Sequence, residues 1–406
     1  MAVILFGLAS ILNPIFVIFF VFEVAIISNQ FSFPDCFSYS YTDKKIIFDI
    51  LLTFWLFTIF RLRISKIPWH LFTITVFAII GNWYLLAGIG KLGIDWHSNN
   101  HLSKLFLASV RHGWLSGFDN LVDIIHNFTV KYDPILTYGT YLVEIILPLL
   151  LILKRKLTIA ILVIFIFFHI SIFVSSGIFF WKWIITEIVL ILVIVISYRH
   201  NFFTLRNYLI YVICLLVAPL FYSNLKLSWL DSGIINYYSF YLKSGSDELI
   251  KLDASFFSPY DLVFAQNRFF FHTDRHHLSN TYGSNFNQEA VELINKSEVM
   301  TNPFFDSLRN VYGKNDFDVT KAAKFELFLN KFITNKLDND RKLISYLDPP
   351  MHITQGQNQQ NFDQLQTLGE SPGELIMIYQ EEQLFNIGKN KVFYSDTTSI
   401  KLKCAE

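Results

Sequence analysis

Long apolar runs, separated by short polar segments, fill the chain up to about residue 222. Most of these runs are close in length to the roughly 17–25 residues that a helix needs to cross the hydrocarbon core of a bilayer. The N-terminal run has neither a basic leader nor a small-residue cleavage site, so we expect it to be kept as the first span. The pattern predicts seven membrane-spanning helices, at Val3–Ile27, Ile46–Phe60, Trp69–Gly90, Pro134–Leu153, Leu157–Val174, Ile178–Ile196 and Tyr208–Phe221.

The connection between the third and fourth predicted spans, residues 92–133, is long for a loop. Its apolar residues keep a partly helical spacing, which predicts a helix that lies at the membrane interface or re-enters the bilayer. These apolar residues are Leu105, Phe106, Leu107, Val110, Trp114 and Leu115.

After residue 222 the chain becomes polar, with many Asn, Asp, Lys and Gln residues. Residues 237–243 are aromatic and strand-like, and a Ser-Gly-Ser turn separates them from a second candidate strand at residues 248–252. This order predicts a β-hairpin. Further along, the spacing predicts helices at Gln288–Glu298 and Val319–Lys336 and an exposed loop at Gln355–Asn361.

The expected fold is therefore a polytopic α-helical membrane bundle of about seven helices, followed by an extramembrane α+β domain. We expect the membrane domain at residues 1–222 and the second domain, which begins with the hairpin, at residues 223–406. Charged residues make up only 16% of the chain, against about a quarter of an ordinary soluble domain. The 33 basic and 33 acidic residues cancel, so no net field would attract nucleic acid, and the expected partner is membrane lipid.

Basic residues gather in the connections after the second, fourth and sixth predicted spans, whereas Ser175-Ser176-Gly177 on the other side is uncharged. The positive-inside rule then places the N-terminus in the cytoplasm and the C-terminal domain outside it. The Lys91 end of the third span also lies on the outer face.

The sequence thus predicts a multi-pass protein of the cell membrane, and its richness in Ile, Phe, Lys and Asn suggests a bacterial inner membrane. The basic residues are Arg61, Arg63, Lys66, Lys154, Arg155, Lys156, Arg199 and Arg206.

Disulfide and metal sites have little support in the sequence. Cys36, Cys214 and Cys404 form no CxxC pair, and a Cys36–Cys404 disulfide stays open. His272 and His276 are four residues apart and would share a helical face that could hold a metal, although a solvated loop explains them as well. We expect no metal. Serine-hydrolase, P-loop and Rossmann motifs are missing from the sequence.

Four ionisable residues lie within or at the end of the predicted spans: Lys91, Glu144, His169 and Glu187. A charged side chain at the centre of a membrane helix costs about 2.5–3.5 kcal/mol unless it is paired or faces a cavity. One interpretation is structural: buried pairs that lock helices together, and a lysine whose ammonium reaches the headgroups. The other is a shared polar pocket in which a desolvated lysine acts as a base.

Several segments between residues 46 and 270 resemble the HTTM superfamily, the membrane domain shared with vitamin K-dependent gamma-carboxylases. The helix end around Lys91 resembles that family's glycine- and lysine-bearing helix end, and the later histidine helix and the Trp-plus-hairpin start of the polar domain are similar too. The residues that carry the resemblance are Tyr84-x-x-Ala87-Gly88-x-x-Lys91-Leu92-x-x-Asp95-Trp96, Glu144, Lys154-Arg155-Lys156, Phe168-His169, Ser176-Gly177-Ile178-Phe179, Trp229, Leu242-Lys243-Ser244-Gly245 and Leu252-Asp253-x-x-x-Phe257-Ser258-Pro259-Tyr260-Asp261.

The resemblance implies a lyase-type carboxylase that uses a reduced, vitamin K-like quinone reached from the outer leaflet. A lysine at the position of Lys91 is the proposed base in oxygenation of the hydroquinone, and the strong base that results takes a proton from a glutamate side chain of a peptide or protein substrate. Lys91 is thus the expected catalytic residue. The expected pocket residues are Tyr84, Asp95, Trp96, Glu144 and His169.

Two functions stay open: a membrane enzyme that uses a quinone-type cofactor, and a non-catalytic membrane receptor or assembly protein that binds lipid and an extracytoplasmic partner. A transporter has less support, because the sequence shows no inverted repeat. The enzyme hypothesis expects Lys91 to lie in a pocket with Glu144 or His169, whereas the receptor hypothesis expects Lys91 to face the headgroups. Whether all three side chains converge on one outer-leaflet cavity is the observation that best separates them.

Overall fold

A computed structural model gives the architecture of most of the chain. It describes residues 2–22, 41–63, 68–99, 101–197, 202–222, 228–243, 249–252, 254–257, 263–264, 267–285, 287–297, 301–337, 375–384 and 392–402.

The chain is mostly helical, has a small amount of sheet, and divides into two compact units. The first unit contains residues 1–94, 135–171 and 180–228. The second contains residues 95–134, 172–179 and 229–406. The change of composition near residue 222 predicts a single boundary, whereas the contacts also group residues 95–134 and 172–179 with the C-terminal part of the chain.

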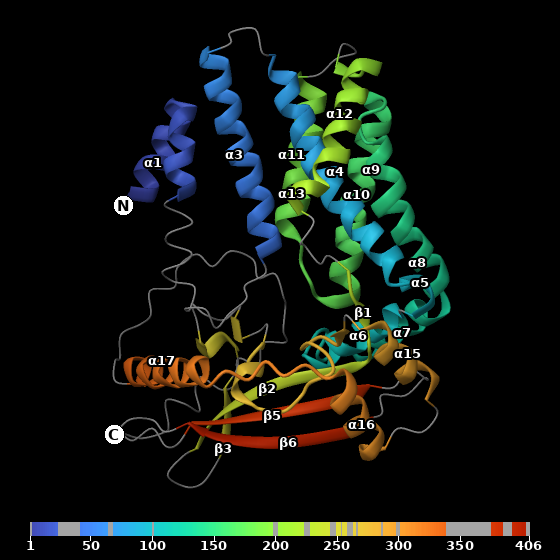
Figure 1. Cartoon of the computed structure of the whole chain (residues 1–406), viewed down its shortest axis with the longest axis vertical. Coiled ribbons are helices and arrows are strands. Elements are labelled where there is room, and N and C mark those ends of the chain that lie inside the picture. The colour runs from blue at the N-terminus through green and yellow to red at the C-terminus, as the bar shows by residue number, and fades with distance from the viewer. Residues whose placement is uncertain are drawn as a thin grey trace. The chain divides into compact units, whose positions relative to one another are not determined.

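The first unit consists of helices that run side by side (Figure 1). A short π-helical turn, η2, interrupts the helix that begins at α8. In chain order the elements are α1 (Ala2–Leu12), the 3-10 turn η1 (Pro14–Phe16), α3 (Tyr41–Arg63), α4 (Trp69–Gly93), α8 (Asp133–Tyr141), η2 (Leu142–Ile146), α9 (Leu147–Leu150), α10 (Arg155–Ser176), α11 (Trp181–Ser197), α12 (Leu205–Val217) and α13 (Pro219–Tyr222).

Three helices of the described chain are long and apolar enough to cross a membrane: Trp69–Gly93, Asp133–Leu150 and Arg155–Ser176. They coincide with the third, fourth and fifth predicted spans to within a few residues. Helix α12 is apolar but shorter, and α11 has 17 residues. The prediction that apolar segments of the first part form helices able to span a membrane is therefore confirmed for these three.

The first predicted span is not one continuous helix. Helix α1 ends at Leu12, and Pro14 begins a 3-10 turn before helical residues resume at residue 17. A proline has no backbone N–H and its ring crowds the carbonyl four residues earlier, so the helix breaks here. The sequence of Val3–Ile27 is mostly apolar, so its hydrophobic pattern alone does not predict this break.

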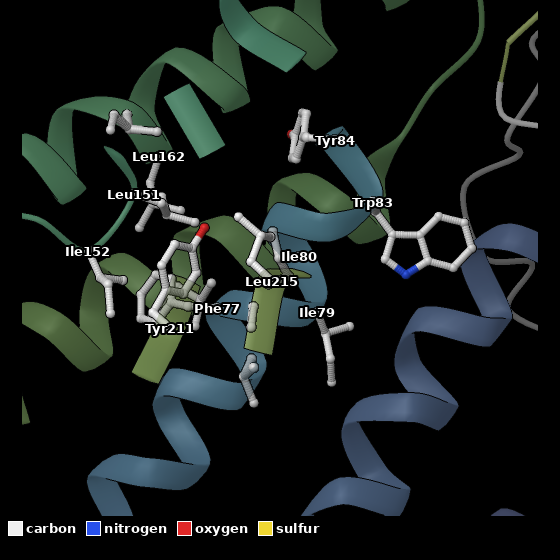
Figure 2. Packing of buried hydrophobic residues seen from close by; sticks show 14 of the residues in the cluster. Phe77, Ile79, Ile80, Trp83, Tyr84, Leu151, Ile152, Leu162, Tyr211 and Leu215 are labelled. Carbon is white, nitrogen blue, oxygen red and sulfur yellow. The ribbon is translucent and has the colours of Figure 1, made fainter. Parts of the chain in front are cut away.

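Helix α4 supplies the core of the first unit. Its buried side chains include Phe77 and Ile80, which pack with Tyr211 and Leu215 of α12 and with Leu151 (Figure 2). The contact is close because Gly81 has no side chain: a Cβ there would lie 2.5 Å from the Tyr211 hydroxyl. That hydroxyl donates a hydrogen bond to the carbonyl of Pro148, and this bond joins α12 to α9.

Large apolar side chains also cover the outside of the first unit. Phe167 of α10 is 65% exposed, and Ile196 of α11 and Leu216 of α12 are 76% and 66% exposed. Exposed apolar surface on this scale is unusual for a protein surrounded by water. It is the arrangement expected of helices whose outer faces meet lipid.

The second unit combines helices with antiparallel sheets. A four-stranded sheet has the order β3-β2-β5-β6, and β1 pairs with β4 in a separate two-stranded sheet. The elements are α5 (Trp96–Asn99), α6 (Leu102–Arg111), α7 (Asp119–Lys131), β1 (Leu230–Asp231), β2 (Ile234–Lys243), β3 (Leu249–Leu252), the 3-10 turns η4 (Ala254–Phe257) and η5 (Phe270–His272), β4 (Ser284–Asn285), α15 (Gln288–Lys296), α16 (Asn302–Tyr312), α17 (Val319–Leu337), β5 (Leu375–Leu384) and β6 (Val392–Leu402).

Several predictions for the polar part are confirmed. Strand β2 pairs with β3 as an antiparallel hairpin, in which Lys243 lies opposite Leu249. Helices α15 and α17 match the two predicted helices, and the predicted helix within residues 92–133 appears as α6 followed by α7. The predicted Gln355–Asn361 loop lies outside the described residues. The sequence pattern did not predict α16, β5 or β6, although β2 pairs over a longer stretch with β5 than with β3.

Phenylalanine fills the core of the second unit. The ring of Phe240 on β2 packs edge-to-face against Phe257, Phe264 and Phe269, and Phe269 stacks on Phe325 of α17 at 4.9 Å. Aromatic pairs of this kind contribute roughly 0.5–1.5 kcal/mol each beyond the burial of their area. Part of the unusual phenylalanine content thus serves the polar unit.

Candidate functional site

Lys91 and Glu144 form a buried ion pair within the first unit. The Lys91 Nζ atom donates to both carboxylate oxygens of Glu144, each at 2.6 Å. The two side chains are 14% and 7% exposed. Since an isolated charge in an apolar interior is costly, each residue supplies the partner that the other requires.

A glycine permits the close approach of these two segments. Gly88, one turn before Lys91 on α4, lies against the backbone and side chain of Glu144 and against Ile145. A Cβ at Gly88 would be 2.5 Å from Ile145 Cγ1 and 3.0 Å from Glu144 Cβ. Any larger residue would push α4 away from η2, so Gly88 sets the distance at which the Lys91 amine meets the carboxylate.

Glu144 sits in the π-helical turn η2, and Pro148 explains this turn. Pro148 lies four residues after Glu144, so it cannot donate the usual helical hydrogen bond to the Glu144 carbonyl, and its ring crowds that carbonyl. The N–H of Leu147 instead bonds to the carbonyl of Leu142, five residues earlier. Such single π-turns occur often at functional sites, because they turn a side chain away from its regular helical direction.

A second buried cluster surrounds Glu187 of α11. The Tyr84 hydroxyl donates to Glu187 Oε1 at 2.6 Å, and His169 Nδ1 lies 3.3 Å from the same oxygen. The Tyr84 hydroxyl is also 3.4 Å from His169. Glu187 is completely buried, and Tyr84 and His169 are 5% and 6% exposed. Helices α4, α10 and α11 thus each contribute one member.

The two clusters share a helix face. Tyr84 precedes Lys91 by seven residues on α4, so both side chains project from the same side of that helix, about two turns apart. Glu144 interacts electrostatically with both Tyr84 and His169. A change of charge in one cluster therefore acts on the other.

Aromatic rings enclose the Glu187 cluster. Phe165 stacks on Tyr84 with ring centroids 3.9 Å apart, and Phe180 and Trp183 lie 5.4 and 5.6 Å from the His169 ring. This apolar enclosure lowers the local dielectric and strengthens each polar interaction inside it.

The structure brings together four of the six expected site residues, Lys91 with Glu144 and Tyr84 with His169. Asp95 and Trp96 belong to the second unit. Asp95 has a positive φ of 49° after the end of α4, and its carboxylate lies 3.2 Å from His97 Nδ1. Trp96 is buried.

The sequence pattern predicted Glu187 as an embedded acid but not as the partner of Tyr84. Tyr84 could have indicated this contact, because its hydroxyl lies in the same apolar helix as Lys91 and needs a hydrogen-bond partner there. The role of Gly88 in the approach of Glu144 was also missed, although Gly88 belongs to the motif around Lys91.

The histidines of the second unit do not form the metal site considered from the sequence. His272 ends the short turn η5, and His276 follows outside any helix, so the two share no helical face. Among the described residues there is no group of three His, Cys, Asp or Glu placed to hold a metal. Cys214 is a free thiol, and Cys36 and Cys404 lie outside the described residues.

Burial lowers the pKa of His272 to about 4. Its ring packs against Phe271 and Phe325, at 4.9 and 5.0 Å between centroids. An apolar environment disfavours the charged imidazolium, so His272 is a neutral core residue at physiological pH.

No protein-family model, no curated protein and no solved structure matches this chain. Its function is therefore inferred from its own residues and their geometry.

Proposed function

We infer that the chain is a multi-pass membrane enzyme that transfers protons to and from a lipid-soluble, hydroquinone-type molecule, with Lys91 and Glu144 as its acid–base pair. The observation that carries this inference is the buried contact between the Lys91 amine and both Glu144 oxygens at 2.6 Å. Intramembrane ionisable residues are rare and mark functional sites by default.

The pair can generate a base without changing its net charge. When the Lys91 ammonium passes one proton to the Glu144 carboxylate, a neutral amine and a neutral acid replace the two ions. The amine then accepts a proton from a bound hydroxyl group, which a protonated lysine cannot do. The Lys91 side chain is 14% exposed and the Glu144 side chain 7%, so we expect a ligand to approach the pair from the lysine side.

The residues present suit a reduced quinone. A hydroquinone head group needs a proton acceptor at its hydroxyl and apolar walls around its ring. Lys91 and Glu144 supply the first, and the apolar surface of the helices supplies the second. When bound, the reduced quinone would supply the electrons for reaction with oxygen. The resemblance to vitamin K-dependent gamma-carboxylases suggests that the acceptor of the reaction is a glutamate side chain of a peptide or protein on the outer face.

The proposed topology has seven spans, a cytoplasmic N-terminus and a C-terminal domain outside the cytoplasm. Its support is the distribution of basic residues among the connections. Reporter fusions after Lys156 and after Trp229 should report opposite sides of the membrane. If both fusions report the same side, this topology is wrong.

The enzymatic proposal is tested with purified protein in lipid nanodiscs, supplied with a vitamin K hydroquinone, oxygen, labelled bicarbonate and a glutamate-containing peptide. Loss of hydroquinone and incorporation of label into the peptide are measured separately. Lys91→Arg keeps the charge but cannot deprotonate at neutral pH. We expect Lys91→Arg and Lys91→Met to lower hydroquinone consumption by at least about 100-fold, the scale of general-base catalysis.

Lys182→Arg on α11 is the matched control, because it makes the same substitution outside the site. It should retain full activity. A fully active Lys91→Arg variant would remove Lys91 as the base. Hydroquinone consumption without labelling of the peptide would limit the proposal to an oxidoreductase.

A second candidate is a non-catalytic membrane receptor or assembly protein that binds lipid and an extracytoplasmic partner. The bidentate contact of Lys91 with Glu144 favours it in one respect, because such a pair can simply lock α4 to η2. In that case wild-type protein consumes no hydroquinone. Exchange of the two charges in Lys91→Glu/Glu144→Lys would also preserve folding and partner binding.

A further inference from the structure

We propose that Glu187, with Tyr84 and His169, forms a second proton-binding site inside the helical unit, which holds one proton and exchanges it with the Lys91–Glu144 pair. This proposal goes beyond the proposed function, because it holds whether or not the chain is an enzyme. It assigns a role to Glu187, which the Lys91 chemistry alone does not require.

Charge balance requires this proton. Glu144 and Glu187 are the buried carboxylates of the described part of the first unit. Lys91 neutralises Glu144 through its direct contact. Glu187 contacts Tyr84 and His169, neither of which carries a permanent positive charge. A fully buried, unneutralised carboxylate is too costly, so one proton must reside on Glu187 itself or on His169.

The geometry allows this proton to move within the site. His169 Nδ1 lies 3.3 Å from Glu187 Oε1. When the proton moves, the O–H bond of the Glu187 carboxyl breaks and an N–H bond forms on His169, so a neutral pair becomes an ion pair with no change of net charge. The Tyr84 hydroxyl donates to the same oxygen at 2.6 Å and stabilises the carboxylate form.

Exchange with the first pair also conserves the total charge. If the proton leaves the Glu187 site and binds Glu144, the Glu187 site becomes negative by one unit and the Lys91–Glu144 pair becomes positive by one unit. The sum over the five residues is unchanged, and the negative Glu187 site and the positive Lys91–Glu144 pair attract each other across the apolar interior, with Tyr84 and Lys91 about two turns apart on α4. The aromatic rings around His169 shield the site from exchange with bulk water.

The test is infrared difference spectroscopy of the full-length protein at pH 7, in a detergent without ester carbonyls, because a protonated carboxyl group has a C=O stretching band that a carboxylate lacks. We expect a band that disappears in Glu187→Gln if the proton resides on Glu187. If it resides on His169, the band is missing from the wild type but appears in His169→Phe, and is lost again in His169→Phe/Glu187→Gln. Either result supports the site. A spectrum with no Glu187-dependent carboxyl band in the wild type or in His169→Phe would overturn it.

Exchange with the first pair is tested in Lys91→Met. Without the ammonium, Glu144 must take up a proton, so a Glu144-dependent carboxyl band should appear. The Glu187-dependent band, which is followed in the His169→Phe background if the wild type lacks it, should shift. An unshifted Glu187-dependent band would show that the two sites are independent and would overturn the exchange. His169→Gln repeats the measurement if His169→Phe does not fold. A single symmetric peak in gel filtration and an unchanged circular-dichroism spectrum establish folding for each variant.

Discussion

Lys91 at the end of α4 and Glu144 in the π-turn η2 share two hydrogen bonds of 2.6 Å across 53 positions of the chain. The lysine end of one helix is thereby joined to the distorted middle of another. The same contact explains why a lysine and a glutamate are tolerated in apolar segments, and it places a proton donor and acceptor side by side where water is scarce.

The first prediction concerns the coupling between these two residues. Lys91→Met should destabilise the protein by roughly 3–5 kcal/mol, because the buried Glu144 carboxylate loses its partner and must take up a proton to remain in the apolar interior. Glu144→Gln should have a similar effect. The double variant Lys91→Met/Glu144→Gln should cost less than the sum of the two, because no unpaired charge remains. Chemical unfolding in detergent measures the three values, and purely additive losses would show that the pair is not coupled.

The second prediction concerns Gly88. Gly88→Ala should destabilise the protein by roughly 1–3 kcal/mol, because its Cβ would lie 2.5 Å from Ile145 Cγ1 and 3.2 Å from the Glu144 carbonyl carbon. The control is Gly139→Ala on α8, where no atom lies within 4 Å of the added Cβ. That change should be neutral or stabilising by up to about 1 kcal/mol. Equal effects of the two substitutions would mean that Gly88 does not set the α4–η2 distance.

The third prediction concerns the pH dependence that follows from His272. Its pKa is about 4 in the folded protein, because burial disfavours the charged ring, against 6.5 in the unfolded chain. The unfolded state therefore binds more protons in this window, so stability falls as the pH falls from about 6.5 to about 4. The loss is at most about 3 kcal/mol, since one pKa unit corresponds to about 1.36 kcal/mol.

Hydrogen exchange of η5 and α17, corrected for intrinsic rates, should show this loss as faster opening at pH 4.5 than at pH 6.5. His272→Phe should remove most of the difference. The hydrogen bond with His277 lowers the pKa of Asp316 to about 2. Asp316 therefore changes the stability only below about pH 3.8, outside the window of His272. An unchanged pH dependence in His272→Phe would assign the effect to other groups.

The fourth prediction concerns Lys104, a lysine of α6 that is 6% exposed and donates to Asn295. Burial lowers its pKa to about 8, while Asp231 and Asp133 oppose this shift. Between pH 8 and its ordinary value of 10.5 the unfolded chain binds more protons, so stability should rise with pH across this window. The difference between unfolding curves of the wild type and Lys104→Gln isolates the effect. A difference that is flat from pH 8 to 10.5 would contradict the prediction.

Most of the local structure follows from residue patterns along the chain. The apolar spacing predicted the helices that became α4, the α8–α9 segment and α10, and the hairpin β2–β3 and the helices α15 and α17 followed from aromatic content and helical period. These signals are local, because the direction of a side chain in a helix or strand depends on its near neighbours along the chain. The same apolar pattern marks Lys91, Glu144, His169 and Glu187 as embedded ionisable residues.

Which of these residues meet depends on how the helices of the first unit pack. Lys91 pairs with Glu144, and His169 turns to Glu187 together with Tyr84, because the rotation of each helix and the π-turn before Pro148 set where each side chain points. Residues 375–402 likewise show no local sign that they add two strands to a hairpin formed near residue 240. Pairings between distant segments depend on the packing of the whole unit, so they cannot be predicted from the spacing of hydrophobic residues along the chain.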